Sequence, residues 1–304
     1  MQTPAFDPGL TQKFTAPVSR VIKKDGSFNV RRRGGNWHDI NPYLHLVNMS
    51  WPAFLLTVFV GYLAVNLVFA LAFFSLGPGH LAGIDASTAG GRFLDTFFFS
   101  AHTLTTVGYG NMSPKSNAAN VIAVFEAMVG VMGFAVATGL LFGRVSRPSA
   151  KIGFSANMLV APYQGGTSLQ FRVVNRRRND LMELEARVML MTVETRDDQT
   201  LRQYKLLKLE RNKVLFLPLT WTVVHPIDAE SPLWGLGPED LAHLQTEVLI
   251  LIKGYDDTFS QTVLSRYSYR HEEILWNKRF APAFDVNAEG DLMLDLEKVG
   301  QITE

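Results

Sequence analysis

The sequence contains no cysteine, which excludes disulfide bonds and thiolate metal sites in this chain. Charge is also scarce and balanced, since charged residues make up 19% of the 304 positions and the net charge is +1. A chain without a basic excess gives no reason to expect a nucleic-acid partner. Signatures of catalysis are missing too, because there is no H-E-x-x-H, G-x-S-x-G or paired-carboxylate motif. These absences argue against an enzyme and against a resident cofactor.

Charge is most conspicuously absent from two long segments. Trp51–Leu76 has 26 residues and no charged side chain, and Val121–Phe142 carries Glu126 as its single charge. A helix of about 20 apolar residues crosses a bilayer, so both segments are long enough to span one. The alternative is a pair of core helices in a soluble protein, where uncharged runs of this length are rare. We predict two membrane-spanning helices.

The basic residues lie mainly outside this pair of segments. Those that precede the first segment are Lys13, Arg20, Lys23, Lys24, Arg31, Arg32 and Arg33. Arg144, Arg147 and Lys151 follow the second segment, whereas only Arg92 and Lys115 lie between the two. The cytoplasmic bias of Lys and Arg in membrane proteins predicts cytoplasmic termini and an external middle loop. We therefore expect a multi-pass protein of the cell (inner) membrane.

The region between the two predicted spans has the pattern of a re-entrant loop. Residues 77–92 form a glycine-rich outer loop, and Phe93–Leu104 is an apolar run of about three helical turns, too short to cross. The segment TLTTVGYGNMSP, Thr103–Pro114, follows it. Non-helical backbone at membrane depth is tolerated only where it is buried in protein or lines water. A half-helix followed by such a segment predicts a chain that enters the membrane and returns to the same side.

Two shorter segments precede the first span. Residues 1–36 are polar and rich in charge and glycine, so we predict an irregular or extended segment. From Asp39, residues 37–50 place apolar side chains at helical spacing, which suits a short helix in the membrane interface. A cytoplasmic extension of the first span is the alternative, although Pro42 and Pro52 favour a break.

After Pro148 the sequence changes character. Runs rich in Val, Leu, Phe and Thr, separated by turn residues, are GTSLQFRVV, ARVMLMTVE, VLFLPLTWTVV and TEVLILIKG. No G-x-G-x-x-G follows a strand there, so a doubly wound nucleotide-binding domain is not indicated. We predict an all-β cytoplasmic sandwich over residues 148–304.

The string TVGYG, Thr106–Gly110, has the residues that a backbone ion site requires. A K⁺ ion in a pore must exchange its water shell for other oxygens, which rings of backbone carbonyls can supply. Gly108 and Gly110 permit the φ values that this arrangement needs. The carbonyls that would bind K⁺ belong to Thr106, Val107, Gly108 and Tyr109. One copy of the string per chain implies four chains around one axis, and therefore a homotetramer.

These residues resemble those of an inwardly rectifying potassium channel, and the chain is most similar to the prokaryotic KirBac members. Beyond the filter, the motifs that carry the resemblance are KKDGSFNV (23–30), GRVSRPSAK (143–151), HPIDAESPLWG (225–235) and EILWNKRF (273–280). The resemblance implies passive potassium conduction by a homotetramer whose chain has two transmembrane helices, a re-entrant pore helix and filter, and a cytoplasmic immunoglobulin-like β-sandwich. A subunit of a potassium uptake transporter is the alternative, although such chains normally carry four pore loops.

The resemblance also implies a division of the chain and a set of ligands. The expected parts are a cytoplasmic N-terminal segment (1–36), an interfacial slide helix (37–50), a transmembrane pore domain (51–147) and a β-sandwich (148–304). The ligands are K⁺ ions in the filter, anionic lipid headgroups at the membrane surface, and Ba²⁺, Mg²⁺ or polyamines as blockers. No other cofactor is implied.

Roles along the pore follow residue by residue from the resemblance. Gly130 lies where the family has a hinge glycine, and Phe142 where prokaryotic members have an apolar gate at the bundle crossing. Packing between helices is the alternative role for Phe142. Phe134 replaces the cavity acid of strong rectifiers, so we expect weak rectification. Tyr255 is expected at the narrow point of the cytoplasmic vestibule.

Acidic and basic positions complete the expectations. Glu185 aligns with an acid of the vestibule, Lys253 replaces another, and Asp256 and Asp257 would concentrate cations at its apex. Ordinary exposed turn residues are the alternative for the two aspartates.

Lipid contact is expected at the cytoplasmic face. Anionic headgroups would attract Arg144, Arg147 and Lys151. Activation by phosphoinositide is doubtful, because Asn48 and Ser50 stand where eukaryotic members carry basic residues.

An ionisable residue inside a span is a functional candidate. Glu126 would either contact His102, just ahead of the filter, or satisfy hydroxyl groups of the pore helix.

Overall fold

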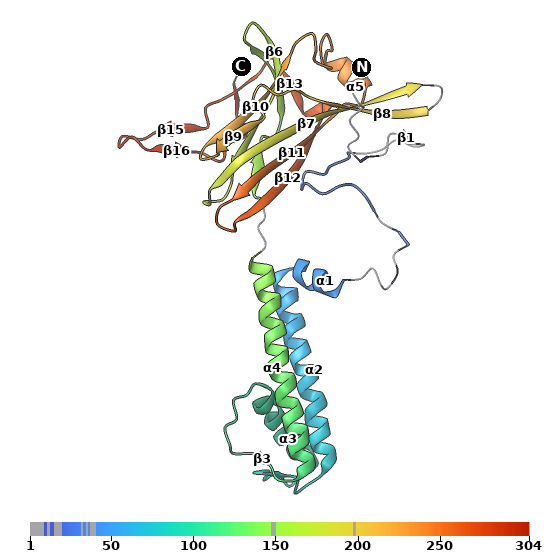
Figure 1. Ribbon diagram of the computed structural model, residues 1–304, viewed down its shortest axis with the longest axis vertical. Helices are drawn as coiled ribbons and strands as arrows, with labels where there is room; N and C mark the ends of the chain where they lie inside the picture. The colour runs from blue at the N-terminus through green and yellow to red at the C-terminus, as the bar shows by residue number, and fades with distance from the viewer. Residues whose placement is uncertain are drawn as a thin grey trace. The chain divides into compact units, whose positions relative to one another are not determined.

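The computed structural model describes residues 9–10, 13–14, 20–31, 33–34, 36, 41–146, 150–196 and 199–303. The chain divides into two compact units. Residues 33–147 form a helical unit, which we call the membrane unit. Residues 148–304, together with the N-terminal residues up to Arg32, form the second unit, which we call the β domain. Figure 1 labels their elements.

The membrane unit contains four helices. They are α1 (Pro42–Asn48), α2 (Trp51–Leu76), α3 (Ala89–Leu104) and α4 (Asn117–Val145). In Figure 1, α2 and α4 run side by side and α3 packs beside them at one end. Two short strands, β2 (Leu81–Ala82) and β3 (Ser113–Pro114), pair antiparallel and join the loops on either side of α3.

The two long helices are the predicted membrane spans. They are long and apolar enough to cross a bilayer, and only 22% of the most apolar window of α2 and 6% of that of α4 are buried. A core helix of a soluble protein would bury most of its residues. The fold-class prediction of two membrane-spanning helices followed by an all-β domain is confirmed.

The pore helix α3 begins four residues earlier than its apolar run indicates. Thr88 caps the helix, because its side chain accepts a hydrogen bond from the backbone N–H of Gly91 at 3.2 Å. A Cβ atom on Gly91 would lie 2.7 Å from the Cβ of Ala86, so this turn of the helix requires glycine. Hydrophobic periodicity does not detect such a start.

The helix predicted within residues 37–50 is shorter than expected. Asn41 caps α1 by accepting from the N–H of Leu44 at 3.2 Å, and Pro42 occupies the first turn, where its missing donor costs nothing. Residues 37–40 lie outside the described part of the chain. Extended backbone at Met49 and Ser50 separates α1 from α2, so the alternative of one continuous helix is wrong.

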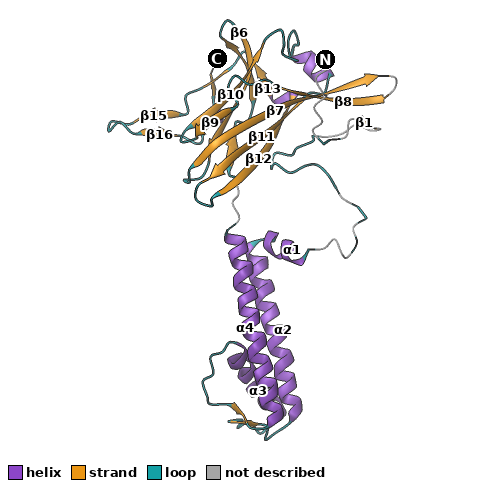
Figure 2. Ribbon diagram, in the orientation of Figure 1, coloured by secondary structure: helices purple, strands orange, loops and turns teal. Residues whose placement is uncertain are grey.

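The β domain is a sandwich of two sheets (Figure 2). The first sheet has the order β1-β8-β7-β11-β12, with β9 pairing β7. Its strands are β1 (Lys13–Phe14), β7 (Leu181–Arg196), β8 (Gln199–Leu206), β9 (Lys213–Phe216), β11 (Glu247–Asp256) and β12 (Gln261–Arg270). The second sheet has the order β10-β6-β5-β13, with β4 pairing β6. Its strands are β4 (Ile152–Phe154), β5 (Met158–Tyr163), β6 (Gly166–Asn175), β10 (Thr220–Ile227) and β13 (Ile274–Trp276).

A single apolar core lies between the sheets. Its fully buried members include Phe171, Leu190, Ile250 and Tyr269, contributed by both layers. All pairings are antiparallel except that of β13 with β5. Between β10 and β11 lies the short helix α5 (Pro238–His243), and the 3₁₀ turn η2 (His271–Glu273) precedes β13.

The four predicted β runs all contain strands. GTSLQFRVV lies in β6, ARVMLMTVE in β7 and TEVLILIKG in β11. VLFLPLTWTVV divides into β9 and β10, because the chain leaves the sheet around Pro218. Strand β12 carries alternating polar residues and was not singled out from the sequence.

Residues 20–30 pack onto the β domain rather than standing alone. The buried carboxylate of Glu247 accepts from the N–H of Val21 at 2.9 Å, and Ser268 donates to the carbonyl of Ile22 at 2.8 Å. Lys24 forms an ion pair with Glu273 at 2.8 Å. The sequence indicated an irregular or extended segment here, but not its docking.

The C-terminal residues form two small two-stranded sheets, and the hairpin β15–β16 projects from the sandwich (Figure 1). The elements are β14 (Arg279–Phe280), β15 (Phe284–Val286), β16 (Leu292–Leu294), the 3₁₀ turn η3 (Lys298–Gly300) and β17 (Ile302–Thr303). β15 pairs with β16, and β14 pairs with β17.

Candidate functional site

The segment after the pore helix has an alternating backbone. Thr106, Gly108 and Gly110 have φ values of +61°, +54° and +81°, whereas Val107 and Tyr109 between them do not have positive φ. A strand turns successive carbonyls to opposite sides, but alternation between left- and right-handed φ turns them to the same side. The glycines permit this at low cost, and Thr106 adopts it despite its side chain.

The amide groups of this segment point back to the pore helix. Val107 N–H donates to the carbonyl of His102 at 2.9 Å, and Thr106 N–H donates to the carbonyl of Thr103 at 3.0 Å. Among the described residues, no donor reaches the carbonyl oxygens of Thr106–Gly110. A row of unoccupied carbonyl oxygens is therefore available for a cation.

An aromatic contact joins the pore helix to the segment Thr106–Gly110. The rings of His102 and Tyr109 meet edge to face, with centroids 4.8 Å apart. His102 therefore packs on the filter tyrosine.

The acid Glu126 satisfies a pore-helix hydroxyl. Ser100 Oγ donates to its carboxylate, and lies 3.1 Å from the carbonyl of Asn66. All three residues are completely buried, and the Asn66 side chain has no partner among the described residues. Of the two partners left open by the sequence, the structure has the hydroxyl of α3 and not His102.

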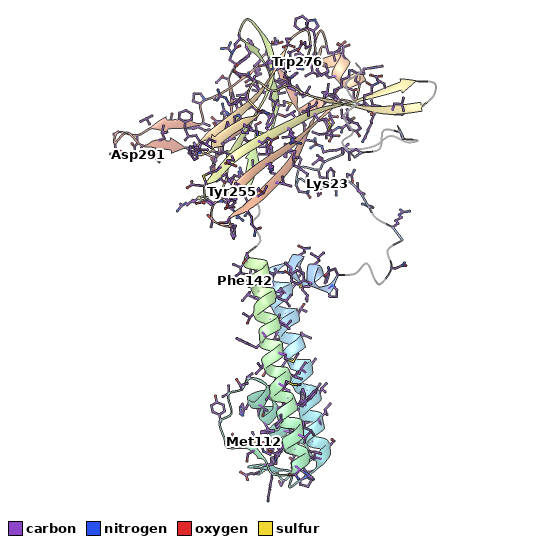
Figure 3. The ribbon with its side chains drawn as sticks, in the orientation of Figure 1. Lys23, Met112, Phe142, Tyr255, Trp276 and Asp291 are labelled. Atoms are coloured by element: carbon purple, nitrogen blue, oxygen red, sulfur yellow. The ribbon has the colours of Figure 1, made fainter. Side chains whose placement is uncertain are left out.

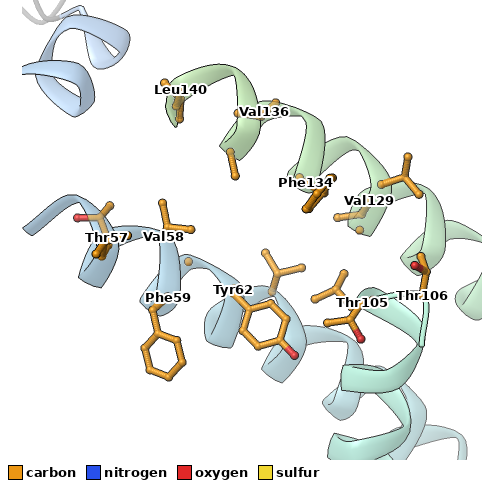
Figure 4. A pocket seen from close by; sticks show the side chains of 18 of the residues that line it. Thr57, Val58, Phe59, Tyr62, Thr105, Thr106, Val129, Phe134, Val136 and Leu140 are labelled. Carbon is orange, nitrogen blue, oxygen red and sulfur yellow. The ribbon is translucent and has the colours of Figure 1, made fainter. Parts of the chain in front are cut away.

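A groove lies between α2, the end of α3 and α4 (Figure 4). Its volume is about 980 Å³, and its mainly apolar lining runs from Thr106 past Phe134 to Leu140. The ring of Phe134 is 77% exposed, so its own chain offers it no packing partner.

Gly130 packs against the pore helix. A Cβ atom at this position would lie 2.1 Å from the carbonyl oxygen of Leu104, the last residue of α3. The inner helix α4 can therefore approach the base of the filter segment only with glycine here. This contact gives Gly130 a packing role beside the hinge role that the resemblance implies.

The inner end of α4 carries Phe142 (Figure 3), whose side chain is 72% exposed. The next residue, Gly143, accommodates Tyr43 of α1, because a Cβ atom there would lie 2.7 Å from the tyrosine hydroxyl. At the end of α4, the side chain of Phe142 is therefore exposed, whereas Gly143 contacts α1.

Arg144 binds the corner between α1 and α2. Its guanidinium donates to the carbonyls of Leu46, Val47 and Met49 at 2.6, 2.9 and 2.8 Å, and lies 4.5 Å from the ring of Phe54. These carbonyls sit at the end of α1, where backbone acceptors lack helical partners. The sequence indicated that Arg144 binds lipid headgroups. The structure adds hydrogen bonds from Arg144 to backbone carbonyls of its own chain, which the local sequence pattern does not reveal.

Lys151 and Arg147 are the two other basic residues predicted to contact lipid. Lys151 precedes β4 and is exposed. Arg147 lies outside the described part of the chain.

Cations surround Glu185 in the β domain. It forms an ion pair with Arg187 at 2.9 Å, and Lys213 and Lys253 lie opposite it on the two neighbouring strands. The hydrogen bond from Arg187 lowers the pKa of the Glu185 carboxyl, so the residue stays ionised but its charge is compensated.

The turn between β11 and β12 corrects one expectation. Tyr255 (Figure 3) and Asp257 are exposed, whereas Asp256 is only 1% exposed. The Asp256 carboxylate lies 3.4 Å from the N–H of Phe259, inside the turn. Asp256 is therefore not a solvent-facing acid that attracts cations, because it holds the turn instead.

The described side chains do not form a metal site. In the described ranges, no cluster of three or more His, Asp or Glu side chains has the geometry to hold a metal. The free backbone carbonyls after α3 are the cation ligands that the geometry offers.

Comparisons with known proteins agree over almost the whole chain. Residues 152–304 match the family described as the inward rectifier potassium channel C-terminal domain, and residues 55–147 match the ion channel family. The inward rectifier potassium channel Kirbac3.1 of Paramagnetospirillum magnetotacticum is 34% identical, with 94% of this chain and 96% of that protein covered.

Animal relatives match at lower identity. The ATP-sensitive inward rectifier potassium channel 11 of Cavia porcellus is 27% identical, covering 93% of this chain and 77% of that protein. Channel 14 of that name from Homo sapiens is 28% identical, covering 90% and 70%. Among solved structures, the sporulation control protein Spo0M of Bacillus subtilis matches with a TM-score of 0.25 and 13% identity over 43% of this chain and 50% of its own, too weak a likeness to carry an argument. The chain belongs to the inward rectifier potassium channel family, and is thus an ion channel of the membrane and not an enzyme.

Proposed function

We propose that four copies of this chain surround one potassium-selective pore whose filter is Thr106–Gly110. The observation that carries the proposal is the alternating backbone, with φ positive at Thr106, Gly108 and Gly110 and with no donor among the described residues on the carbonyls. Four such segments around an axis would replace the water shell of K⁺ by rings of oxygens. The oxygens that bind K⁺ belong to Thr106, Val107, Gly108 and Tyr109.

The membrane unit supports a homotetramer. One chain supplies a single strand of carbonyls, which cannot surround an ion. The groove beside the filter leaves apolar surface uncovered where a neighbouring chain would pack. We propose that both termini are cytoplasmic and that the protein resides in the inner membrane, following the distribution of Lys and Arg.

We propose that Phe142 is the gate. Four exposed phenylalanines near the pore axis would form an apolar constriction that stops ions by dewetting. We propose that Gly130 is the hinge of α4, in addition to its packing contact with Leu104.

Weak rectification follows from the charges along the pore. Phe134 puts no acid into the cavity, Glu185 is compensated by cations, and Asp257 is the exposed acid beside Tyr255 at the vestibule apex. Spermine should therefore block weakly from the cytoplasmic side, while Ba²⁺ blocks at the filter.

Anionic lipid would act through the basic residues that follow Phe142 in the sequence. Lys151 is exposed and free to attract headgroups, and Arg147 follows α4 in the sequence. Arg144 would reach lipid only by giving up its three carbonyl partners. Lipid binding would therefore be linked to the corner between α1 and α2.

Flux from proteoliposomes tests the proposal. Wild-type protein should release K⁺ at least tenfold faster than Na⁺, and Ba²⁺ should block the release. Gly108→Ala should abolish this preference, because alanine at φ +54° is strained and the carbonyls must turn. Gly139→Ala, in open space on α4, is the control that leaves the preference unchanged. Tetramers of Gly108→Ala with unaltered K⁺ preference would overturn the filter assignment.

A further inference from the structure

The hairpin β15–β16, which we call the arm (residues 284–294), has two unlike faces. Its register places Val286 opposite Leu292 and Asp285 opposite Met293. Cross-strand partners share a face, so Phe284, Val286, Leu292 and Leu294 form one apolar face. Asp285 and Met293 lie on the opposite face, where Asp285 is 3.6 Å from Lys298.

Most of the apolar face is left exposed by the described residues. Val286 is 63% exposed and Leu292 is 55% exposed. An isolated two-stranded hairpin is marginally stable in water and requires a surface to pack on. Exposed apolar patches of this kind mark interaction surfaces.

The arm is nevertheless built to keep its shape. At its tip, near Asp291 (Figure 3), the side chain of Asn287 accepts from the N–H groups of Glu289 at 3.1 Å and of Asp291 at 2.7 Å. At its base, Arg172 donates to the carbonyl of Ala281 at 2.7 Å, and Ala283 is buried. A hairpin fixed at both ends presents its apolar face in a defined orientation.

The charge of the arm indicates which kind of surface it would pack against. The arm contains three acidic residues and no basic one, namely Asp285, Glu289 and Asp291, and Lys298 outside the arm pairs with Asp285. Anionic lipid would repel this segment, which disfavours a membrane surface. The exposed strand β9 has the opposite character, because Leu215 and Phe216 follow the exposed cations Arg211 and Lys213. The β domain thus carries both an acidic apolar arm and a basic apolar patch.

We propose that the apolar face of the arm packs against the β domain of a second copy of this chain. The inference rests on the proposed tetramer, in which each β domain has an identical neighbour. A ring of identical chains uses two different patches on each chain, and the arm and the β9 patch provide two patches of complementary charge. The interaction surface comprises Phe284, Val286, Leu292 and Leu294.

Site-specific photo-crosslinking tests the contact. Leu292→p-benzoylphenylalanine should give crosslinked dimers and higher species on a denaturing gel after irradiation of purified, conducting tetramers. Met293→p-benzoylphenylalanine is the matched control, since Met293 is 57% exposed but lies on the other face. We expect at least fivefold more intermolecular product from position 292. Equal yields, or only intramolecular or lipid adducts at 292, would overturn the inference.

Cysteine labelling provides a second measurement, in a chain with no native cysteine. Leu292→Cys should react with a maleimide at least tenfold more slowly than Met293→Cys in the tetramer, and equally fast after denaturation. Equal rates in an intact tetramer that conducts K⁺ would contradict the arm contact and leave the proposed channel standing. Wild-type protein that forms no tetramer would remove the proposed function and this inference together.

Discussion

The membrane unit leaves apolar side chains exposed along α2 and α4 and buries polar ones, such as Asn66, Ser100 and Glu126. The β domain does the reverse, because it encloses Phe171, Leu190 and other apolar residues between two sheets. The first arrangement is stable only in lipid, where burial of apolar groups provides no driving force between helices. The second is the ordinary arrangement in water.

This difference indicates which substitutions should destabilise each unit. Close packing at glycines stabilises the membrane unit: a Cβ atom on Gly130 would meet the backbone of Leu104, and Cβ atoms on Gly91 and Gly143 would meet the side chains of Ala86 and Tyr43, all within 3 Å. Packed volume stabilises the β domain. Added atoms at these glycines should therefore damage the membrane unit, and lost volume should damage the β domain.

Gly130→Ala should have the largest effect. The added methyl would lie 2.1 Å from the carbonyl oxygen of Leu104, so α4 or the pore helix must move. We expect loss of most tetramers and of K⁺ flux, measured by native mass spectrometry and liposome flux. Gly133→Ala is the matched control, because nothing lies within 4 Å of its added methyl. Intact Gly130→Ala tetramers with altered gating alone would favour the hinge instead.

Phe142→Ser should raise flux. A small hydroxyl-bearing side chain would widen the proposed constriction and wet it, so basal K⁺ flux per tetramer should rise severalfold while the preference over Na⁺ is retained. Leu141→Ser controls for a polar substitution one residue away. If Phe142 serves packing between helices, tetramer recovery and flux should fall together. Intact tetramers with unchanged flux would rule out the gate.

Arg144→Lys separates the two roles of this cation. Lysine keeps the charge that attracts lipid but lacks the planar fork that reaches three carbonyls. Hydrogen bonds to charged groups are worth about 1.5–3 kcal/mol each, so we expect the tetramer melting temperature to fall by several degrees. Arg92→Lys, whose arginine side chain makes no hydrogen bond or ion pair to the described residues, should change it little. Unchanged melting of Arg144→Lys would mean that the carbonyl contacts do not stabilise the corner.

His225 should give the β domain a modest pH dependence. Burial lowers the pKa of its imidazole, which lies 2.6 Å from the carbonyl oxygen of Lys208 and 2.8 Å from Ser231 Oγ. The unfolded chain binds a proton near the ordinary pKa of about 6.5, and the folded chain does so only at lower pH. Stability is therefore present above that value and decreases as the pH falls through it.

Thermal unfolding of the full chain checks this sign. The midpoint should be lower at pH 5.5 than at pH 7.5, and His225→Gln, which retains a donor and an acceptor, should reduce the difference. A midpoint that rises on acidification, or a difference that His225→Gln does not change, would contradict the assignment.

The sequence predicts the membrane unit better than the contacts within it. The absence of charge from two segments locates α2 and α4, and TVGYG identifies the filter segment after a short helix. Helix starts depend on single side chains, as at Thr88 and Asn41, and periodicity does not reveal them. The approach of Leu104 to Gly130 depends on tertiary packing, so a family position suggested a hinge where the structure has a close contact.

Contacts between distant residues account for most of what the sequence could not predict. The carboxylate of Glu247 accepts a hydrogen bond from the amide of Val21, which is 226 positions away in the sequence. Arg144 donates to carbonyls of α1, and the residues next to Arg144 in the sequence do not indicate this contact. Asp256 and Asp257 are adjacent and chemically identical, yet only one is buried. Sequence identifies such residues as charged, but only the fold determines which charge faces solvent.

The central claim is that the carbonyls of Thr106–Tyr109 bind potassium on a fourfold axis. Anomalous X-ray scattering from crystals of the full-length protein grown with Rb⁺ in place of K⁺ tests it most directly. The account predicts a file of Rb⁺ peaks on the axis at the level of these carbonyls in the wild type, with peaks lost or displaced in Gly108→Ala. An axis without Rb⁺ between the carbonyls, or an assembly that is not fourfold, would contradict it.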